Sequence, residues 1–274
     1  MPVLQLSPDD GLFYEWERPA DENGVTFVFV NAITGDLGMW EAEIAPALRA
    51  QGHGSLGYNF RGQASSPFRP GTALDEALIV DDLRQLLDRL QPERPVLVGL
   101  SIGGLYAAKA VLAGSHASGL VLINTLRRIG PRIDWMNAAT LRAVEVGGPQ
   151  LVRDLFSHLL NGEAWQAANR QDFLRDDADY TPLDRDSGPY NLLTWMGATD
   201  WDIDWAALDL PVLSLTGLND RVFYEPADVA ELFALLPRGR RIDVAEAGHM
   251  LPIESPGRLI EALGGFADGL ENNS

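Results

Sequence analysis

Short runs of apolar and β-branched residues recur along the chain and alternate with segments of helical periodicity. The run at residues 25–30 is apolar at both odd and even positions, which is typical of a strand buried on both faces. Residues 74–90 instead place leucine and isoleucine three and four positions apart, along one helix face. Strands that alternate with helices predict an α/β fold with a mostly parallel sheet covered on both faces. The expected strands are 11–17, 25–30, 55–60, 96–100, 120–123, 212–215 and 241–244, and the expected helices are 40–49, 74–90, 105–112, 226–236 and 256–268.

The alternation breaks between about residues 131 and 204, where helical patterns continue without a convincing strand. This stretch and its C-terminal border carry five of the seven tryptophans: Trp135, Trp165, Trp195, Trp201 and Trp205. We interpret it as a helical cap in which one or two tryptophans line an apolar pocket and the others pack the helices together. The predicted organisation is a core of residues 1–130 and 205–274 with a cap of residues 131–204.

Composition narrows the function classes. The chain has 274 residues, of which 46% are hydrophobic, enough for a large core. A formal net charge of −18 argues against nucleic acid and anionic membranes as partners, because the long-range field repels them. The absence of cysteine excludes disulfides and a cysteine nucleophile. Without a leader or a long apolar segment, we expect a cytoplasmic protein that acts on a small molecule; the sequence does not define its oligomeric state.

A glycine-flanked serine follows the strand expected at 96–100 and opens the helix expected at 105–112. In Gly99-Leu100-Ser101-Ile102-Gly103, the two glycines remove side chains that would collide on a sharp strand-to-helix turn. Such a turn presents Ser101 at a helix N-terminus, where backbone N–H groups favour developing negative charge. Ser101 is therefore the predicted nucleophile.

A serine hydroxyl needs a base, and His249 follows the last expected strand, at the sheet edge where the serine turn also opens. The other histidines, His53, His116 and His158, are explained more simply as structural or surface residues. Asp220 follows the strand at 212–215 and completes the order Ser, Asp, His of the α/β-hydrolase triad. Asp243 and Glu246 are weaker candidates, because the first lies within a strand and the second is too close to His249 in sequence.

The tetrahedral intermediate requires donors for its oxyanion. One is expected to be the backbone N–H of Ile102, the residue after the nucleophile. The other is expected from the loop after the strand at 25–30, near Ala32 and Ile33.

That loop resembles the oxyanion loop of the 3-oxoadipate enol-lactonase group of α/β-hydrolases, in which asparagine also stands where many superfamily members have histidine, here Asn31. The serine turn and the segment 122–130, Leu-Ile-Asn-Thr-Leu-Arg-Arg-Ile-Gly, are similar to theirs. The resemblance covers residues 25–129 and 216–252 and implies the eight-stranded α/β-hydrolase fold. It fades in the cap. The loop at 61–65 also departs from the family pattern, so the resemblance indicates the reaction class better than the substrate.

The resemblance implies a serine hydrolase of lactones or esters, in which a substrate carboxylate would need a local cation. Arg127 and Arg128 are the candidates, and Arg128 aligns with the family's arginine. Asn31, Ala32 and Trp40 complete the predicted pocket. A thioesterase or a meta-cleavage C–C hydrolase would use the same triad, while a ligand receptor or a cofactor-free haloperoxidase or oxygenase is a more distant alternative. No dinucleotide fingerprint or metal-ligand cluster occurs in the sequence, so no cofactor or metal is expected.

Overall fold

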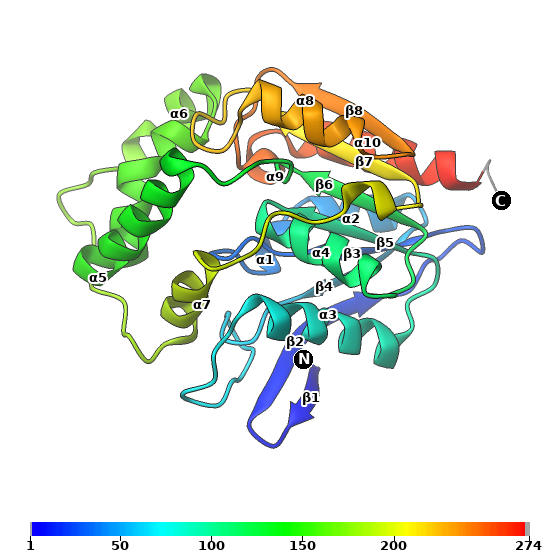
Figure 1. Ribbon diagram of the computed structural model, residues 1–274, viewed down its shortest axis with the longest axis horizontal. Coiled ribbons are helices and arrows are strands. Elements are labelled where there is room, and N and C mark those ends of the chain that lie inside the picture. The colour runs from blue at the N-terminus through cyan, green and yellow to red at the C-terminus, as the bar shows by residue number, and fades with distance from the viewer. Residues whose placement is uncertain (1, 272–274) are drawn as a thin grey trace.

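The computed structural model describes residues 2–271, and its centre is an eight-stranded sheet (Figure 1). The strand order is β1-β2-β4-β3-β5-β6-β7-β8. β1 and β4 run antiparallel to β2, whereas the six neighbouring strands β4, β3, β5, β6, β7 and β8 run parallel to one another. This topology confirms the predicted fold class and adds one strand that the pattern missed, β1 at the sheet edge. The strands are β1 (Val3–Ser7), β2 (Asp10–Glu17), β3 (Thr26–Val30), β4 (Gly54–Tyr58), β5 (Pro95–Leu100), β6 (Gly119–Ile123), β7 (Val212–Gly217) and β8 (Gly239–Val244).

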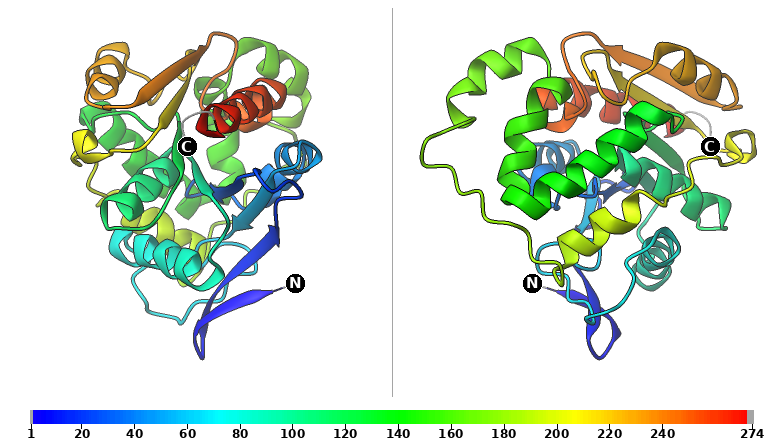
Figure 2. Two further views of the ribbon diagram at one scale, coloured as in Figure 1. Left: turned by 90° about the vertical axis from the view of Figure 1, so that its right-hand side faces the viewer. Right: turned by 60° about the vertical axis from the view of Figure 1, so that its left-hand side comes forward.

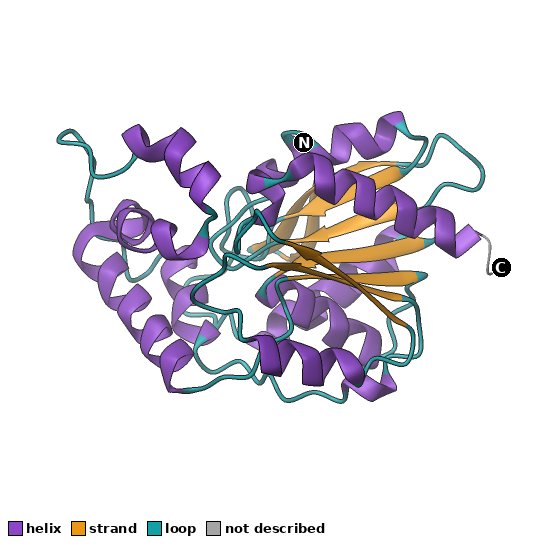
Figure 3. Cartoon of the chain, turned by 90° about the horizontal axis from the view of Figure 1, so that it is seen from above, coloured by secondary structure: helices purple, strands orange, loops and turns teal. Residues whose placement is uncertain are grey.

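Two helical layers cover the faces of the sheet, as Figure 3 shows from above. α3, α4 and α8 contribute to the hydrophobic cluster on one face, and α1, α2, α9 and α10 to the cluster on the other. Every residue of β3, β5, β6 and β7 is buried between them, which explains the continuous apolar runs. The helices are α1 (Gly38–Glu41), α2 (Ile44–Ala50), α3 (Glu76–Leu90), α4 (Ile102–Leu112), α8 (Pro226–Ala234), α9 (Leu251–Glu254) and α10 (Pro256–Glu271).

Local sequence sets the limits of these helices. Asp75 caps α3, since its side chain accepts a hydrogen bond from Leu78 N at 2.9 Å. Gln91 ends the same helix in the left-handed conformation. The single helix expected at 40–49 is instead α1 followed by α2, because Glu43 leaves the helical region with φ −141°.

The segment between β6 and β7 is helical and extends beyond one end of the sheet (Figures 2 and 3). Its longest helix bends at Gly147 and Gly148, where φ of Gly148 is +66° and the added Cβ of any other residue would lie 2.0 Å from Thr181 O. Pro149 follows the bend and lacks the N–H that a continuous helix requires. The elements are α5 (Pro131–Leu160), α6 (Glu163–Asn169), η1 (Arg170–Asp172), α7 (Gly188–Met196) and η2 (Trp205–Ala207).

The inserted helices share their apolar surface with the core. Leu192 and Leu193 of α7 belong to the same hydrophobic cluster as α3 and α4. The division at residues 131–204 into cap and core remains a prediction. Within residues 2–271, no helix combines the length and apolar character that a membrane span requires, and no group of three His, Asp or Glu side chains could hold a metal ion.

Candidate active site

Ser101 occupies a strained turn between β5 and α4. Its φ is +58° and its ψ is −121°, a conformation that residues with a side chain rarely adopt. The turn is fixed from both sides. Ser101 N donates to Ile123 O at 2.7 Å, and a Cβ on Gly103 would lie 2.3 Å from Asn31 O. The strand–turn–helix prediction made from the glycine pattern therefore matches the geometry.

Asp220 and His249 form a buried pair at the ends of β7 and β8. His249 Nδ1 lies 2.6 Å from Asp220 Oδ2, while Asp220 Oδ1 accepts from the backbone N–H groups of Val222 and Phe223 at 3.0 and 2.9 Å. Burial opposes ionisation of Asp220, but His249, the N–H of Phe223 and the charge of Arg127 together lower its pKa below the ordinary value of 3.8. The proton of the neutral imidazole is thus assigned to Nδ1, which leaves Nε2 as the acceptor.

Neighbouring loops anchor the pair, and no sequence pattern singles these loops out. Asn124 Nδ2 donates to the carbonyl oxygens of Gly248 and His249 at 3.0 and 2.9 Å, and its Oδ1 accepts from Gly217 N at 2.8 Å. His249 N in turn donates to Leu160 O at the end of α5. The position of the imidazole is therefore tied to β6, β7 and the inserted helices at once.

Arg127 is a buried cation at the same place. Its Nη2 donates to Ser101 Oγ at 2.6 Å and to Asn124 O at 3.0 Å, and its guanidinium carbon lies 4.3 and 4.4 Å from the ring centroids of Trp201 and Phe223. Burial lowers the pKa of Arg127 to about 10, against the opposing charge of Asp220, so the group stays protonated at neutral pH.

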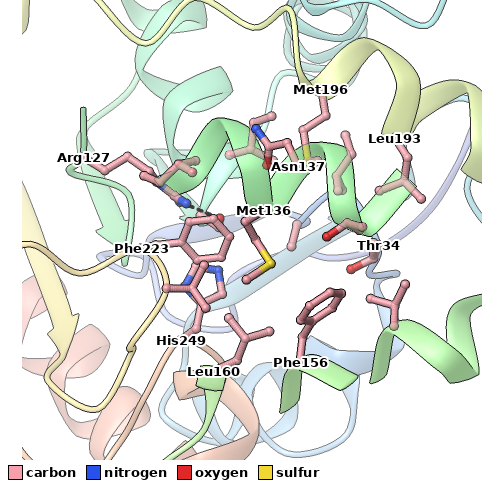
Figure 4. Close-up of a pocket in the computed structure, with 18 of the residues that line it drawn as sticks. Thr34, Arg127, Met136, Asn137, Phe156, Leu160, Leu193, Met196, Phe223 and His249 are labelled. Atoms are coloured by element: carbon pink, nitrogen blue, oxygen red, sulfur yellow. Dashed lines mark hydrogen bonds between the residues drawn. The ribbon is translucent and has the colours of Figure 1, made fainter. Parts of the chain in front are cut away.

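The phenyl ring of Phe223 lies between the guanidinium and the imidazole, as Figure 4 shows. Its centroid is 4.6 Å from that of His249. Among residues 2–271, Arg127 is the one side-chain hydrogen-bond partner of Ser101 Oγ; no hydrogen bond joins that hydroxyl to His249. Ser101 and His249 nevertheless line one cavity.

Ile33 and Ile102 both line that cavity, and neither of their backbone N–H groups has an acceptor among the described residues. Ile102 begins α4, so its N–H has no partner within the helix. The loop of Ile33 is held from behind, because Gln63 Nε2 donates to the carbonyl oxygens of Ala32 and Ile33 at 2.9 and 3.1 Å. Both predicted oxyanion donors thus belong to the cavity wall.

The cavity has a volume of about 140 Å³ and a mostly apolar lining, with α5 and α7 supplying the wall opposite Ser101. Trp201 is the tryptophan of the inserted region that lines it. The loop before α5 contributes one further lining residue, and α5 and α7 contribute the others. In chain order they are Ile129, Ile133, Met136, Asn137, Thr140, Val152, Phe156, Leu160, Leu193 and Met196.

Two predicted pocket residues lie behind the site instead. Trp40 is fully buried and stacks on Phe29 with centroids 4.8 Å apart, so the expectation that it forms a pocket wall is wrong. Asn31 is also fully buried and away from the cavity lining. Its Oδ1 accepts from Trp40 Nε1 at 2.9 Å and its Nδ2 donates to Tyr58 O at 2.9 Å, which makes it an internal support of the oxyanion loop.

Arg128 likewise lies outside the cavity lining, in contrast to Ala32 and Arg127, which are part of it. Its half-exposed side chain lies 3.8 Å from Asp228 and 3.4 Å from Glu231, on the surface of α8. Of the two adjacent arginines, the one that does not align with the family's arginine faces the nucleophile. Phe223 is a further site residue that the sequence analysis missed, and no signal in the sequence singles it out.

Comparison with known proteins identifies the family. The model of the "Alpha/beta hydrolase family" matches residues 27–262. The 3-oxoadipate enol-lactonase 1 of Acinetobacter baylyi is 25% identical over 254 residues, 91% of each chain. A thermophilic esterase from Thermogutta terrifontis superposes with a TM-score of 0.80 at 22% identity over 98% of both chains. The enol-lactonase from Burkholderia xenovorans superposes with a TM-score of 0.76 at 22% identity, and the match covers 97% of this chain and 99% of the enol-lactonase chain. The chain therefore belongs to the alpha/beta hydrolase family and is a hydrolase with esterase- and enol-lactonase-like relatives.

Proposed function

We propose that this hydrolase cleaves lactones or carboxylic esters of a small, carboxylate-bearing substrate through an acyl-enzyme on Ser101. One observation carries the proposal: the strained Ser101 shares a cavity with the His249–Asp220 pair and with the unpaired N–H groups of Ile33 and Ile102. These are the nucleophile, the base with its orienting carboxylate, and the oxyanion donors that acyl transfer requires.

In the first half-reaction, Ser101 Oγ attacks the carbonyl carbon while its proton passes to His249 Nε2. The carbonyl oxygen becomes an oxyanion and accepts hydrogen bonds from Ile33 N–H and Ile102 N–H. Asp220 stabilises the imidazolium through Nδ1. When the intermediate collapses, the C–O bond to the leaving alcohol breaks and His249 returns the proton to that oxygen. In a lactone the new hydroxyl remains attached to the acyl group.

In the second half-reaction, water attacks the Ser101 ester and gives its proton to His249 Nε2. The bond between Oγ and the acyl carbon then breaks, Ser101 recovers the proton, and the carboxylic acid leaves. His249 acts first as base and then as acid in each half, so its contact with Asp220 must persist throughout.

The cavity supports a small substrate with one anionic group. Its lining is apolar apart from a few groups, and Arg127 is the one Lys or Arg side chain that lines it among residues 2–271. A buried guanidinium is a carboxylate-binding group, since its donors match the two carboxylate oxygens. The name of the Acinetobacter baylyi relative, 3-oxoadipate enol-lactonase, also denotes a carboxylate-bearing lactone substrate.

The test combines covalent labelling with a variant. A fluorophosphonate should add one phosphonyl group to Ser101 of the wild-type protein, detected by mass spectrometry of the peptide. Ser101→Ala should lose the label and at least about 10³-fold in kcat on a panel of lactones and esters. Ser118→Ala is the matched control, because Ser118 precedes β6 at the sheet edge away from Ser101. This variant should keep both the label and the turnover. Near-native turnover by Ser101→Ala would refute the mechanism, and faster turnover of thioesters or vinylogous diketones would redirect the substrate class.

A further inference from the structure

Arg127 is buried without a carboxylate partner, which sets it apart from the other buried arginine near the sheet edge. Arg61 Nε donates to Asp82 Oδ2 at 2.7 Å, and Arg61 Nη1 lies 3.5 Å from Asp10 Oδ1. No Asp or Glu side chain among the described residues up to 270 lies within 4.0 Å of the Arg127 guanidinium, whose charged donors reach instead a hydroxyl and backbone carbonyls. A buried cation with neutral acceptors retains an unmet demand for a negative charge.

We propose that Arg127 is a latch that determines specificity: at rest it holds the Ser101 hydroxyl away from His249, and a substrate carboxylate releases that hydroxyl by taking over the guanidinium. The proposal rests on the function proposed above and deepens it. No covalent bond changes in the release. The guanidinium keeps its charge, one hydrogen bond moves from Ser101 Oγ to a carboxylate oxygen, and the freed hydroxyl becomes able to donate to His249 Nε2.

The exchange is downhill because the two acceptors differ in charge. A hydrogen bond from guanidinium to carboxylate is roughly twice as strong as one between neutral partners, and the planar donor set can hold both carboxylate oxygens. A neutral hydroxyl offers one acceptor and no charge. The latch is therefore stable against neutral acceptors and yields to an anionic ligand. A neutral ester offers only uncharged oxygen acceptors, which have no advantage in charge over the Ser101 hydroxyl.

The residues around Arg127 hold the plane of its guanidinium but leave the N–H donors at its edge free to change acceptor. Trp201 and Phe223 contact the guanidinium with their ring faces, at 4.3 and 4.4 Å, so they hold its plane and leave its edge free. Phe223 is fixed by the hydrogen bond from its N–H to Asp220 Oδ1. Its ring also lies between Arg127 and His249, where it separates the fixed cation from the imidazolium that forms during turnover.

A simple carboxylate clamp and a latch make different predictions for neutral substrates. A clamp that only binds the substrate contributes to KM for anionic esters and has no effect on neutral ones. A latch also restrains Ser101 when no carboxylate is present. Its removal must therefore accelerate the hydrolysis of neutral esters while it slows that of anionic esters.

The experiment compares the monomethyl and dimethyl esters of one short dicarboxylic acid, at a pH where the free acid is ionised. Arg127→Met removes every donor and keeps an unbranched apolar side chain in place of the arginine stem. We expect kcat for the dimethyl ester to rise about tenfold, the equivalent of one charged hydrogen bond, and kcat/KM for the monomethyl ester to fall about a hundredfold. Arg128→Met, on the adjacent exposed arginine, should leave both values within twofold of wild type. A fall for both esters, or an unchanged dimethyl ester, would overturn the latch.

A measurement on the wild-type protein keeps the proposal testable if Arg127→Met does not fold. Saturating acetate should accelerate the labelling of Ser101 by a neutral fluorophosphonate several-fold, because the carboxylate occupies Arg127. Slower or unchanged labelling would overturn the latch. The two failures are distinguishable: absence of label and of Ser101-dependent turnover refutes the proposed function, whereas Ser101-dependent turnover without the ester contrast or the acetate effect refutes the latch alone.

Discussion

Glu254 holds the two backbone segments that position His249, and its removal should be costly. Its carboxylate accepts three backbone hydrogen bonds: from Gly162 N at 2.6 Å, Gly248 N at 2.9 Å and Met250 N at 3.0 Å. Gly248 and Met250 flank the imidazole in the chain, and Gly162 begins the segment that leads into α6. One half-buried side chain therefore joins the histidine loop to the inserted helices.

The magnitude follows from the three bonds. Hydrogen bonds to a charged group are worth about 1.5–3 kcal/mol each in buried settings, and the lower value applies to a half-buried carboxylate. Water can replace part of this, so Glu254→Ala should lower the free energy of unfolding by about 3 kcal/mol. Glu254→Gln keeps one oxygen for Gly162 N and Gly248 N but turns an NH₂ group toward Met250 N, and should cost about 1 kcal/mol.

Urea unfolding followed by tryptophan fluorescence measures the losses in the free energy of unfolding. Turnover of the folded variants measures how far a displaced His249 impairs catalysis. We expect kcat of Glu254→Ala to fall at least about tenfold, since small displacements of a catalytic group are costly. Glu261→Ala is the control, because Glu261 is exposed on α10 and forms a surface ion pair with Arg258. A stability of Glu254→Ala within 0.5 kcal/mol of the wild type, a spread typical of surface substitutions and only about a third of one such bond, would refute the reasoning.

Burial raises the pKa of Glu254 above its ordinary 4.5, against the three N–H groups that lower it. A raised folded-state pKa contributes stability that is complete below the unfolded value and is lost as pH rises through the folded value. The deficit of Glu254→Gln relative to wild type should therefore be larger at pH 4 than at pH 7. An equal or reversed difference in urea unfolding would contradict this assignment.

Two further substitutions test the site. Asp220→Asn should lower kcat by about 10⁴ in the ester assay with Nδ1 of His249 no longer held by a carboxylate, and near-native activity would contradict its role. Because the folded-state pKa of Asp220 is lowered, its contribution to stability is present above about pH 4 and lost as pH falls through the folded value, so the stability gap to Asp220→Asn should narrow in acid. Gly103→Ala should lower the free energy of unfolding by at least about 3 kcal/mol, because the added Cβ would lie 2.3 Å from Asn31 O. A melting temperature within a few degrees of wild type would refute the clash.

The sequence was informative wherever backbone geometry dictates the residue. A serine turn at the end of β5 needs small residues at fixed spacing, so Ser101 could be located from its flanking glycines together with the strand before it and the helix after it. Parallel strands also carry their C-terminal loops to one sheet edge, so residues after β7 and β8 could be expected to meet. Asp220 and His249 lie there, 2.6 Å apart. These inferences required no knowledge of where any loop side chain points.

The predictions that failed concern side-chain direction within loops. Arg127 and Arg128 are neighbours in sequence, yet one is buried against Ser101 and the other lies on the surface of α8. Their directions depend on a loop that leaves β6 through Asn124, whose φ is +50°. Asn31 and Trp40 could not be placed either, because their mutual hydrogen bond forms across nine residues and a helix start. Patterns of polarity contain no signal for such torsions.

The groups proposed for the chemistry and those that surround the substrate come from different parts of the chain. Ser101, Asp220 and His249 follow strands of the core, and their positions are fixed by backbone hydrogen bonds to neighbouring strands and loops. Nine of the 21 residues that line the cavity lie in the inserted helices α5 and α7, and Trp201, which follows α7, presents its ring face to Arg127. Substitutions of cavity-lining side chains in α5, α7 or at residue 201 should therefore change which acyl group fits and how firmly Arg127 is held, while the backbone bond from His249 N to Leu160 O and the acyl-transfer geometry stay in place. For this reason the substrate has to be sought through the cavity and its buried cation rather than through the core that the chain shares with its relatives.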